Sequence, residues 1–350
     1  MRKTLLLSSI FLALVLAGCQ KEEQIEPIHN DSICTGPEGA VNGLFSIADG
    51  RQVYFSIGNL QWSATGGGAV PATHAVSGGG NAAGIWRFAP HQYDFVGNAG
   101  GNVDPGERQS EWMDLFGWAT SGYHQGGDLF NVNYFPYSTS FEVINDGPGN
   151  PFGYGPSSYM VDPNLEGESA NYDWGVYNAI SNGGNQPGLW HTLSSEEWDY
   201  LLNLRRATPL NGTLDARFAE VVVNGVKGLM LFPDSLVWPQ GVNYPIAINQ
   251  YLFSANRSLW EDAAPYNLAQ FALLEKAGCV FLPAAGSRRG MLVANAGDMG
   301  YYWFSNVLNA QIPDLDGHYA YHLVFDFDLL DVYLADRCRG YSVRLVQEAK

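Results

Sequence analysis

The sequence predicts an α+β protein with short mixed or antiparallel sheets, two main helices and long loops rich in glycine and aromatic residues. Glycine occupies 41 of the 350 positions, and aromatic residues make up 13% of the chain. Short strand patterns separated by turn residues run along most of the sequence, and two segments carry helical patterns. Charged residues make up only 15%, well below the quarter or so that is typical of soluble proteins.

The charge balance excludes one class of partner. The chain carries 18 Lys and Arg against 35 Asp and Glu, which gives a formal net charge of −17. A nucleic-acid binder needs a basic surface to displace counterions, so we expect no nucleic-acid partner. Hydrophobic residues reach 46%, which is enough apolar surface to argue against global disorder.

The first residues are typical of a bacterial lipoprotein signal peptide. Arg2 and Lys3 precede an apolar run over residues 5–16, which is too short to span a membrane comfortably. The sequence Leu-Ala-Gly-Cys that ends at Cys19 resembles a lipobox, which is cleaved before the cysteine and lipidated on its thiol. Several acyl chains on one residue hold a protein stably on a bilayer. We therefore expect a leader over residues 1–18 and a membrane anchor at Cys19.

A polar tether over residues 19–38 follows the anchor. Lys21, Glu22 and Glu23 resemble the export signal of surface lipoproteins of Bacteroidota, whereas a plain linker would leave the protein facing the periplasm. We expect an outer-membrane lipoprotein that is exposed on the cell surface. Residues 39–350 are expected to form a single domain.

The first strands are expected just after the tether. Residues 44–47 and 52–56 flank Asp49-Gly50, a pair that suits the positive φ angles of a tight hairpin turn. Short strands are expected over residues 86–89 and 93–96. Long loops are expected over residues 66–84 and 98–188, where turn residues separate isolated aromatic residues.

Two helices are expected in the second half of the chain. Ser194 and Glu197 form a capping box that begins a helix ending near residue 206. A second helix is expected over about residues 267–276, with Leu268, Phe271 and Leu274 facing inward and Gly278 as the stop. A hairpin around Asn224-Gly225 and five later strands complete the prediction: 219–223, 226–232, 279–282, 301–304, 319–327, 332–334 and 342–346.

Four segments, in order, resemble the C-type-lectin-like domains of formylglycine-generating-enzyme type. The blocks are Leu-Ser-Ser-Glu-Glu-Trp-Asp-Tyr-Leu at 193–201, Phe-Leu-Pro-Ala-Ala-Gly at 281–286, Gly-Tyr-Tyr-Trp-Phe-Ser at 300–305 and Gly-Tyr-Ser-Val-Arg-Leu-Val at 340–346. The same series marks the Fibrobacter succinogenes major paralogous domain and related surface lipoproteins of Bacteroidota. The resemblance is strongest over residues 190–346. It implies a C-type-lectin-like fold that serves ligand binding or adhesion.

The resemblance also implies a ligand face in the C-terminal segment, over about residues 290–340. Some members of this fold are variable proteins of diversity-generating retroelements. The absence of Lys and Glu from residues 277–346 agrees with such diversification, whereas Gln311 departs from it. The region is rich in Tyr, Asp, Asn and His, a mixture that binding surfaces use, although a solvated sheet edge would look similar. The expected ligand-binding residues are Asn309, Asp314, His318, Tyr319, Tyr321, His322, Asp326, Asp328, Tyr333 and Arg339. We expect the partner to be an extracellular protein or glycan.

Catalytic residues, cofactors and metal sites are not expected. His318 and His322 would lie about 13 Å apart along a strand, too far to share a zinc ion, and they are interpreted as surface histidines of the ligand face. Asp326 and Asp328 would lie about 7 Å apart on one strand face, as a glycosidase pair can, but no motif supports that chemistry. The paired catalytic cysteines of the resembling enzymes are also missing. The alternatives are an enzyme of formylglycine-generating or glycan-processing type and a structural subunit of the cell envelope or a fimbria.

The cysteines of the domain leave two interpretations open. Cys279 and Cys338 could form a disulfide in an oxidising compartment, or they could be buried free thiols.

Overall fold

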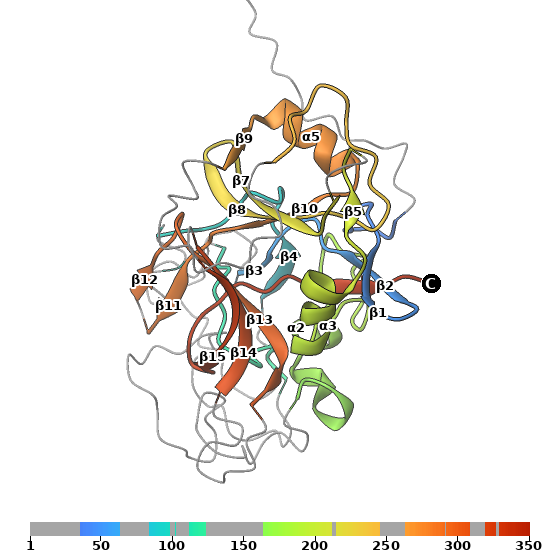
Figure 1. The fold of residues 1–350 in the computed structure, drawn as a ribbon. Coiled ribbons are helices and arrows are strands. Elements are labelled where there is room, and N and C mark those ends of the chain that lie inside the picture. Colours follow the sequence, from blue (N-terminus) through green and yellow to red (C-terminus); the bar gives the residue numbers. More distant parts are fainter. Residues whose placement is uncertain are drawn as a thin grey trace, which may run out of the picture. The chain divides into compact units, whose positions relative to one another are not determined.

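The computed structural model describes residues 36–63, 84–98, 102, 112–123, 164–211, 215–245, 263–290, 292–308, 319–326 and 329–350. All of them belong to one unit of the chain, Thr35–Lys350. The fold is α+β, because several small sheets are accompanied by a few short helices (Figure 1). This agrees with the predicted fold class.

One sheet joins the first and last strands of the domain. It has the order β1 (Phe45–Ala48), β2 (Arg51–Phe55) and β16 (Val346–Glu348), and both pairs are antiparallel. Gly50 has a φ of 74° in the turn between β1 and β2, which confirms the predicted hairpin. The last strand begins later than predicted.

A four-stranded sheet forms the centre of the second half. Its order is β10 (Val280–Pro283), β8 (Val226–Leu231), β7 (Phe218–Val223) and β9 (Ala264–Tyr266), and β9 runs parallel to β7. Asn224 and Gly225 both have positive φ, 49° and 83°, as a tight hairpin turn requires, so the predicted β7–β8 hairpin is confirmed.

The two predicted helices are present. The capping box of Ser194 and Glu197 begins α3 (Ser195–Asp199), which continues as the wider turn η2 (Tyr200–Leu204). Helix α5 (Leu268–Lys276) is capped by Asn267, and Gly278 follows it with a φ of 92°. Leu268 is 45% exposed, contrary to the prediction, because the buried stripe of this helix begins one turn later, at Phe271.

Other parts of the structure differ from the sequence prediction. The expected strand over residues 93–96 is irregular, and the region expected as a loop holds η1 (Gly167–Tyr172) and α2 (Trp174–Tyr177). Asp173 caps α2 by accepting a hydrogen bond from the Gly175 amide. Two further pairs of short strands are β3 (Leu60–Ser63) with β4 (Ile85–Phe88) and β5 (Thr208–Pro209) with β6 (Asp215–Ala216).

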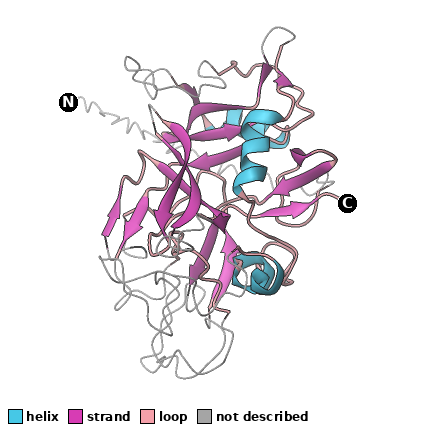
Figure 2. Cartoon of the chain, turned by 60° about the horizontal axis from the view of Figure 1, so that its bottom comes forward, coloured by secondary structure: helices cyan, strands magenta, loops and turns pink. Residues whose placement is uncertain are grey.

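A third sheet carries most of the predicted ligand face. It consists of β13 (Gly300–Val307), β14 (Tyr319–Phe325) and β15 (Leu330–Asp336), in that order and antiparallel throughout. The hairpin β11 (Ser287–Arg289) and β12 (Leu292–Ala294) lies beside this sheet (Figures 1 and 2).

Among the described residues, the core consists of three clusters of buried apolar side chains. The first is rich in tryptophan, the second joins β1, β2 and α3 to β13 and β14, and the third lies between α5 and the four-stranded sheet. Trp198 and Trp303 are 1% exposed and belong to the core.

Candidate functional site

The predicted ligand residues on β14 and β15 do not share one face of the sheet. Successive side chains of a strand point to opposite faces, so Tyr321 and His322 diverge. The His322 ring contacts the Tyr341 ring at a tilt of 38°, whereas Tyr321 packs against the core cluster that contains Leu323. Tyr333 pairs with His322 in the ladder, so these two lie on the same face.

His322 is a core residue, so its interpretation as a surface histidine was wrong. It is 4% exposed, and its ring centroid lies 4.7 Å from that of Tyr341 and 5.9 Å from that of Trp303. Burial lowers the pKa of His322 to about 4, so the imidazole is neutral at physiological pH. The physical reason is the strand register, which places this side chain beside the aromatic cluster that covers one face of β13 and β14.

A cavity of about 500 Å³ adjoins the same sheet. Its lining comes from the β11–β12 hairpin, from all three strands of the sheet and from the segment after β15. We call it the tyrosine cavity, and its lining residues are Ser287, Arg289, Leu292, Ala294, Asn295, Tyr301, Tyr319, Leu334, Ala335, Asp336, Arg339 and Tyr341.

A close backbone approach holds one wall of the tyrosine cavity. Arg288 and Gly340 exchange both backbone hydrogen bonds, at 2.8 and 2.9 Å, and this pair joins β11 to the segment that carries Tyr341. A Cβ atom on residue 340 would lie 2.6 Å from the Cβ of Arg288. Only glycine therefore fits at this position without a shift of the backbone.

Two stacked rings form the aromatic part of the lining. Tyr301 and Tyr341 have ring centroids 4.9 Å apart and an angle of 12° between their planes. Burial raises the pKa of both phenols, so their hydroxyl groups stay neutral and can donate hydrogen bonds. The Asn295 amide lies 3.5 Å from the Tyr301 hydroxyl.

The charged part of the lining consists of Arg289, Arg339 and Asp336. Nε of Arg339 lies 3.7 Å from a carboxylate oxygen of Asp336, which is an ion pair but too long for a hydrogen bond. The two side chains are 33% and 20% exposed, so both remain within reach of solvent. The lining can therefore offer guanidinium donors, a carboxylate acceptor and neutral phenols to one ligand.

The structure places the predicted site residues in three groups. Tyr319 and Arg339 line the tyrosine cavity, whereas His322 is buried and Tyr321 is partly buried against the core. Tyr333 is 45% exposed on β15, and Asp326 follows β14 in the turn to β15; neither belongs to the described lining of the cavity, although the charge of Asp326 helps to raise the pKa of the lining residue Tyr301. The other predicted ligand residues, and the lipidation site, lie outside the described residues: Cys19, Asn309, Asp314, His318 and Asp328.

The sequence prediction missed most of the cavity. Tyr301 and Tyr341 lie in two of the blocks that carry the family resemblance and were not among the predicted ligand residues, and Ser287 and Arg289 precede the predicted ligand segment. Asp336 and Arg339 lie three residues apart in the predicted ligand segment, and this spacing of opposite charges could have indicated both. Only Arg339 was among the predicted ligand residues.

Cys279 and Cys338 are free and buried, so of the two interpretations left open by the sequence, the structure has buried free thiols and no disulfide between them. Cys279 packs among the apolar residues between α5 and the four-stranded sheet, whereas Cys338 lies in the turn after β15. Burial raises the pKa of both thiols, so neither is an activated thiolate. This gives no support to the alternative of a cysteine-dependent oxidase.

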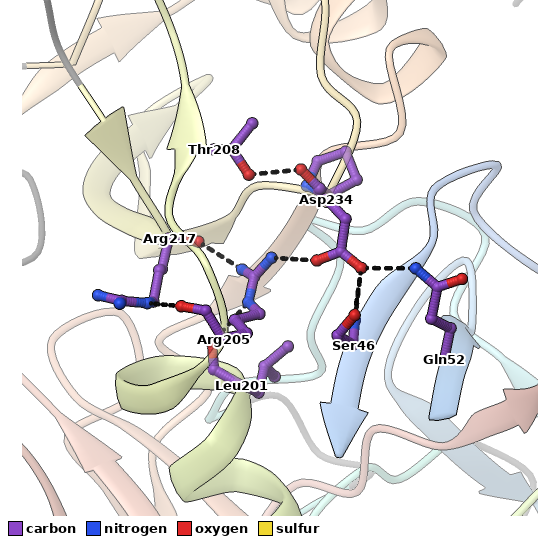
Figure 3. Close-up of polar contacts among 8 residues, drawn as sticks. Ser46, Gln52, Leu201, Arg205, Thr208, Arg217 and Asp234 are labelled. Carbon is purple, nitrogen blue, oxygen red and sulfur yellow. Dashed lines mark hydrogen bonds and ion pairs between the residues drawn. The ribbon is translucent and has the colours of Figure 1, made fainter. Parts of the chain in front are cut away.

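A polar cluster around Arg205 joins several segments of the chain (Figure 3). The Arg205 side chain is 1% exposed and pairs with Asp234 at 2.9 Å, and its other nitrogens donate to the carbonyl oxygens of Leu201 and Arg217. The second oxygen of Asp234 accepts hydrogen bonds from the backbone and hydroxyl of Ser46 and from Gln52. These hydrogen bonds join β1, β2, η2 and the segment after β8. Because the polar groups of the cluster bond to one another, few hydrogen-bonding positions remain for a ligand.

A comparison with family models, with curated proteins and with solved structures finds no match to this chain. Within the described ranges, no group of three or more His, Cys, Asp or Glu side chains could hold a metal ion. No helix in the described part of the chain has the length and hydropathy needed to cross a membrane. Among the described residues, the tyrosine cavity is therefore the candidate ligand-binding site.

Proposed function

We propose that this chain is a lipid-anchored cell-surface protein that binds an extracellular glycan or protein ligand in the tyrosine cavity. The observation that carries the proposal is the composition of the cavity, in which three tyrosines, two arginines and one aspartate converge beside the C-terminal sheet. Tyrosine supplies rigid contact area at a low entropic cost, and polar side chains around an apolar surface fix a ligand's orientation.

Contacts between the four blocks support a C-type-lectin-like fold. The Ser305 amide donates to the carbonyl of Leu193 at 2.9 Å, and the Trp303 amide donates to the carbonyl of Ser342 at 3.0 Å. The Tyr302 hydroxyl donates to the carbonyl of Pro283 at 2.8 Å. Segments chosen from the sequence as one ordered series are thus joined directly around β13, as a shared framework requires.

The position of the cavity also supports the proposed ligand segment. Five of its lining residues, Tyr319, Leu334, Ala335, Asp336 and Arg339, fall in the second half of residues 290–340. Diversification of that segment would change the cavity wall while β11 and Tyr341 keep the opposite wall fixed. A genome in which no reverse transcriptase and no template copy of this coding segment lie nearby would contradict diversification alone.

The experiment compares two tyrosines of the same sheet. Tyr319→Ala removes a cavity residue, and Tyr333→Ala removes an exposed residue of similar size outside the cavity. Capture of glycans and extracellular proteins on arrays should be lost for Tyr319→Ala and kept for Tyr333→Ala, with unchanged melting temperatures. Equal capture by both variants would contradict the cavity as the site, and no capture by the unmodified chain would favour a structural subunit.

The anchor is tested separately with Cys19. Cys19→Ala should move the protein from the membrane fraction to the soluble fraction, because the acyl chains hold it there. A variant that stays with the membrane would refute lipidation at this residue without bearing on the tyrosine cavity.

A further inference from the structure

We propose that the outer edge of β15 takes an extended peptide segment of another protein as an added strand, parallel to β15 and centred on Leu334. This inference rests on the proposed function, because the edge adjoins the tyrosine cavity and the bound segment would be its protein ligand. Three features of the molecule carry it: the strand register, the hydrogen bonds at the two ends of the edge, and the cavity lining.

The backbone bonds of β13 decide which way each residue of the sheet points. The Trp303 amide donates to the carbonyl of Ser342, and the Ser342 amide donates to the carbonyl of Tyr301, both at 3.0 Å. The main chain of Tyr301 and Trp303 therefore points away from β14. These directions alternate along a strand, so the main chain of Tyr302 points toward β14, and its partner there, Leu323, points back to β13.

The same alternation sets the direction of the residues on β15. On β14 the main chain of His322 points to β15, where Tyr333 is its partner. On β15 the neighbours Val332 and Leu334 then point their N–H and C=O groups outward. The Val332 amide agrees with this direction, because it donates to the carboxylate of Asp331 at 2.7 Å.

Four outward main-chain groups around Leu334 have no partner among the described residues. They are the N–H and C=O of Leu334, the C=O of Val332 and the N–H of Asp336. The next group at each end is occupied. The Val332 amide bonds to Asp331, and the carbonyl of Asp336 accepts the amide of Arg339 at 2.9 Å. The free edge is therefore short and bounded at both ends.

These four groups match a parallel strand. In a parallel pair, each residue of one strand donates to one residue of its neighbour and accepts from the residue two positions further on. One peptide residue would donate to Val332 and accept from Leu334. The peptide residue two positions later would donate to Leu334 and accept from Asp336. All four free groups are then bonded, and neither occupied group is needed.

An antiparallel strand matches the edge less well. Antiparallel partners exchange N–H and C=O bonds within each bonded pair, so one peptide carbonyl would face the Asp331 carboxylate and one peptide amide would face the Arg339 amide. Both contacts bring like groups together. Two copies of β15 that pair across a two-fold axis run antiparallel, and each copy carries a net charge of −17. The edge therefore suits a segment of another protein better than a second copy.

The tyrosine cavity reaches this edge. Leu334, Ala335 and Asp336 all line the cavity. Successive side chains of a strand point to opposite faces, so a cavity that touches three successive residues extends to the edge of the strand. Leu334 is 38% exposed. When a peptide adds to a sheet edge, main-chain hydrogen bonds give affinity and pockets for alternate side chains give specificity, and the cavity can supply such a pocket.

The test titrates a synthetic peptide into the full-length protein by calorimetry. The probe is acetyl-Lys-Thr-Val-Leu-Val-Thr-amide, whose two valines would donate to Val332 and Leu334. In the parallel register its lysine lies beside Asp331, which is exposed. N-methylation of both valines removes the two donors and should raise the Kd about 10-fold or more. N-methylation of the first threonine and the leucine alters only the outer edge of the peptide and should leave the Kd unchanged.

Two variants of one residue locate the binding on β15. Leu334→Pro removes the outward N–H, at an edge position where proline is tolerated, and should raise the Kd of the probe about 10-fold or more. Leu334→Ala keeps both main-chain groups and should raise the Kd by a smaller factor. If Leu334→Pro fails to fold, the two methylated peptides still decide the question, since they are measured on the unmodified protein.

The outcomes separate this inference from the proposed function. Main-chain bonds depend little on peptide sequence, so a probe that binds more weakly than about 1 mM refutes the inference. Equal binding of both methylated peptides does so as well, and a dimer of the protein that Leu334→Pro dissociates in sedimentation would assign the edge to a second copy. None of these results changes array capture. If array capture does not depend on Tyr319 while the probe depends on Leu334, the proposed function fails and the peptide site stands.

Discussion

The pair of Arg205 and Asp234 should contribute strongly to the stability of the domain (Figure 3). The Asp234→Ala variant removes the carboxylate and leaves the Arg205 guanidinium, with a side chain 1% exposed, without its counter-charge. Breaking a buried ion pair from one side typically costs about 3–5 kcal/mol. The Asp234 side chain is 20% exposed, so in the variant water can partly take the place of its carboxylate beside the Arg205 guanidinium. We therefore expect the free energy of unfolding to fall by about 3 kcal/mol.

The measurement is urea unfolding, with Asp298→Ala as the matched control. Asp298 pairs with Lys227, but the two side chains are 68% and 32% exposed, so its loss should cost less than about 1 kcal/mol. Both variants should keep the slope of the unfolding free energy against urea, because neither changes the surface exposed on unfolding. If the two variants lose the same free energy of unfolding, the buried cluster does not stabilise the domain as its hydrogen bonds indicate.

Three further predictions concern the turn, the histidine and the thiols. Gly225→Ala should destabilise the domain by about 1 kcal/mol in thermal unfolding, because a φ of 83° disfavours any residue with a side chain. The cost is conformational, since a Cβ atom at this position would have no atom within 4 Å. An unchanged melting temperature would contradict this prediction. The unfolded chain protonates His322 near pH 6.5 and the folded chain near pH 4, so stability should fall as pH drops through that window. His322→Phe should flatten this part of the stability profile, and a variant with the same profile would refute the buried neutral imidazole beside Tyr341. Cys279 and Cys338 should resist alkylation by iodoacetamide at pH 8 in the folded protein and react after unfolding, as peptide mass mapping can show; rapid labelling of either folded thiol would rule out its burial.

The elements that the sequence predicted correctly depend on local chemistry. Asn224-Gly225 can adopt two successive positive φ angles, which specifies a hairpin without reference to the rest of the chain. The same is true of Ser194 and Glu197, whose side chains bond to each other's backbone amides within a single turn. The sequence predicts such turns and helix caps correctly because their backbone angles and hydrogen bonds depend on neighbouring residues and very little on distant ones.

The tyrosine cavity could not be predicted in the same way. Its walls come from strands β11 and β12 with Asn295, from Tyr301 and Tyr319, and from the segment that begins at Leu334 and ends at Tyr341. The backbone pair of Arg288 and Gly340 brings the first and last of these together. The sequence predicted a strand over residues 319–327, and the structure has β14 over Tyr319–Phe325, but the alternation of side chains along a strand does not tell which face meets the core. Composition therefore indicated the C-terminal segment that contains several of the lining residues, while the set of side chains that line the cavity depends on tertiary packing.

One row of the sheet explains which predicted residues a ligand can reach. Trp303, His322 and Tyr333 pair across β13, β14 and β15, and their exposure rises from 1% to 4% to 45% along the row. The aromatic cluster therefore covers the first two strands and leaves β15, the last strand of this sheet among the described residues, open to solvent. Two of the three charged side chains in the described lining of the cavity, Asp336 and Arg339, lie at the end of β15 and in the turn that follows, whereas Arg289 is exposed on β11. Substitutions there change the binding surface at little cost to the core, whereas a substitution at His322 would have to be accommodated among buried aromatic rings. A ligand face that varies without loss of the fold would have to lie along this edge.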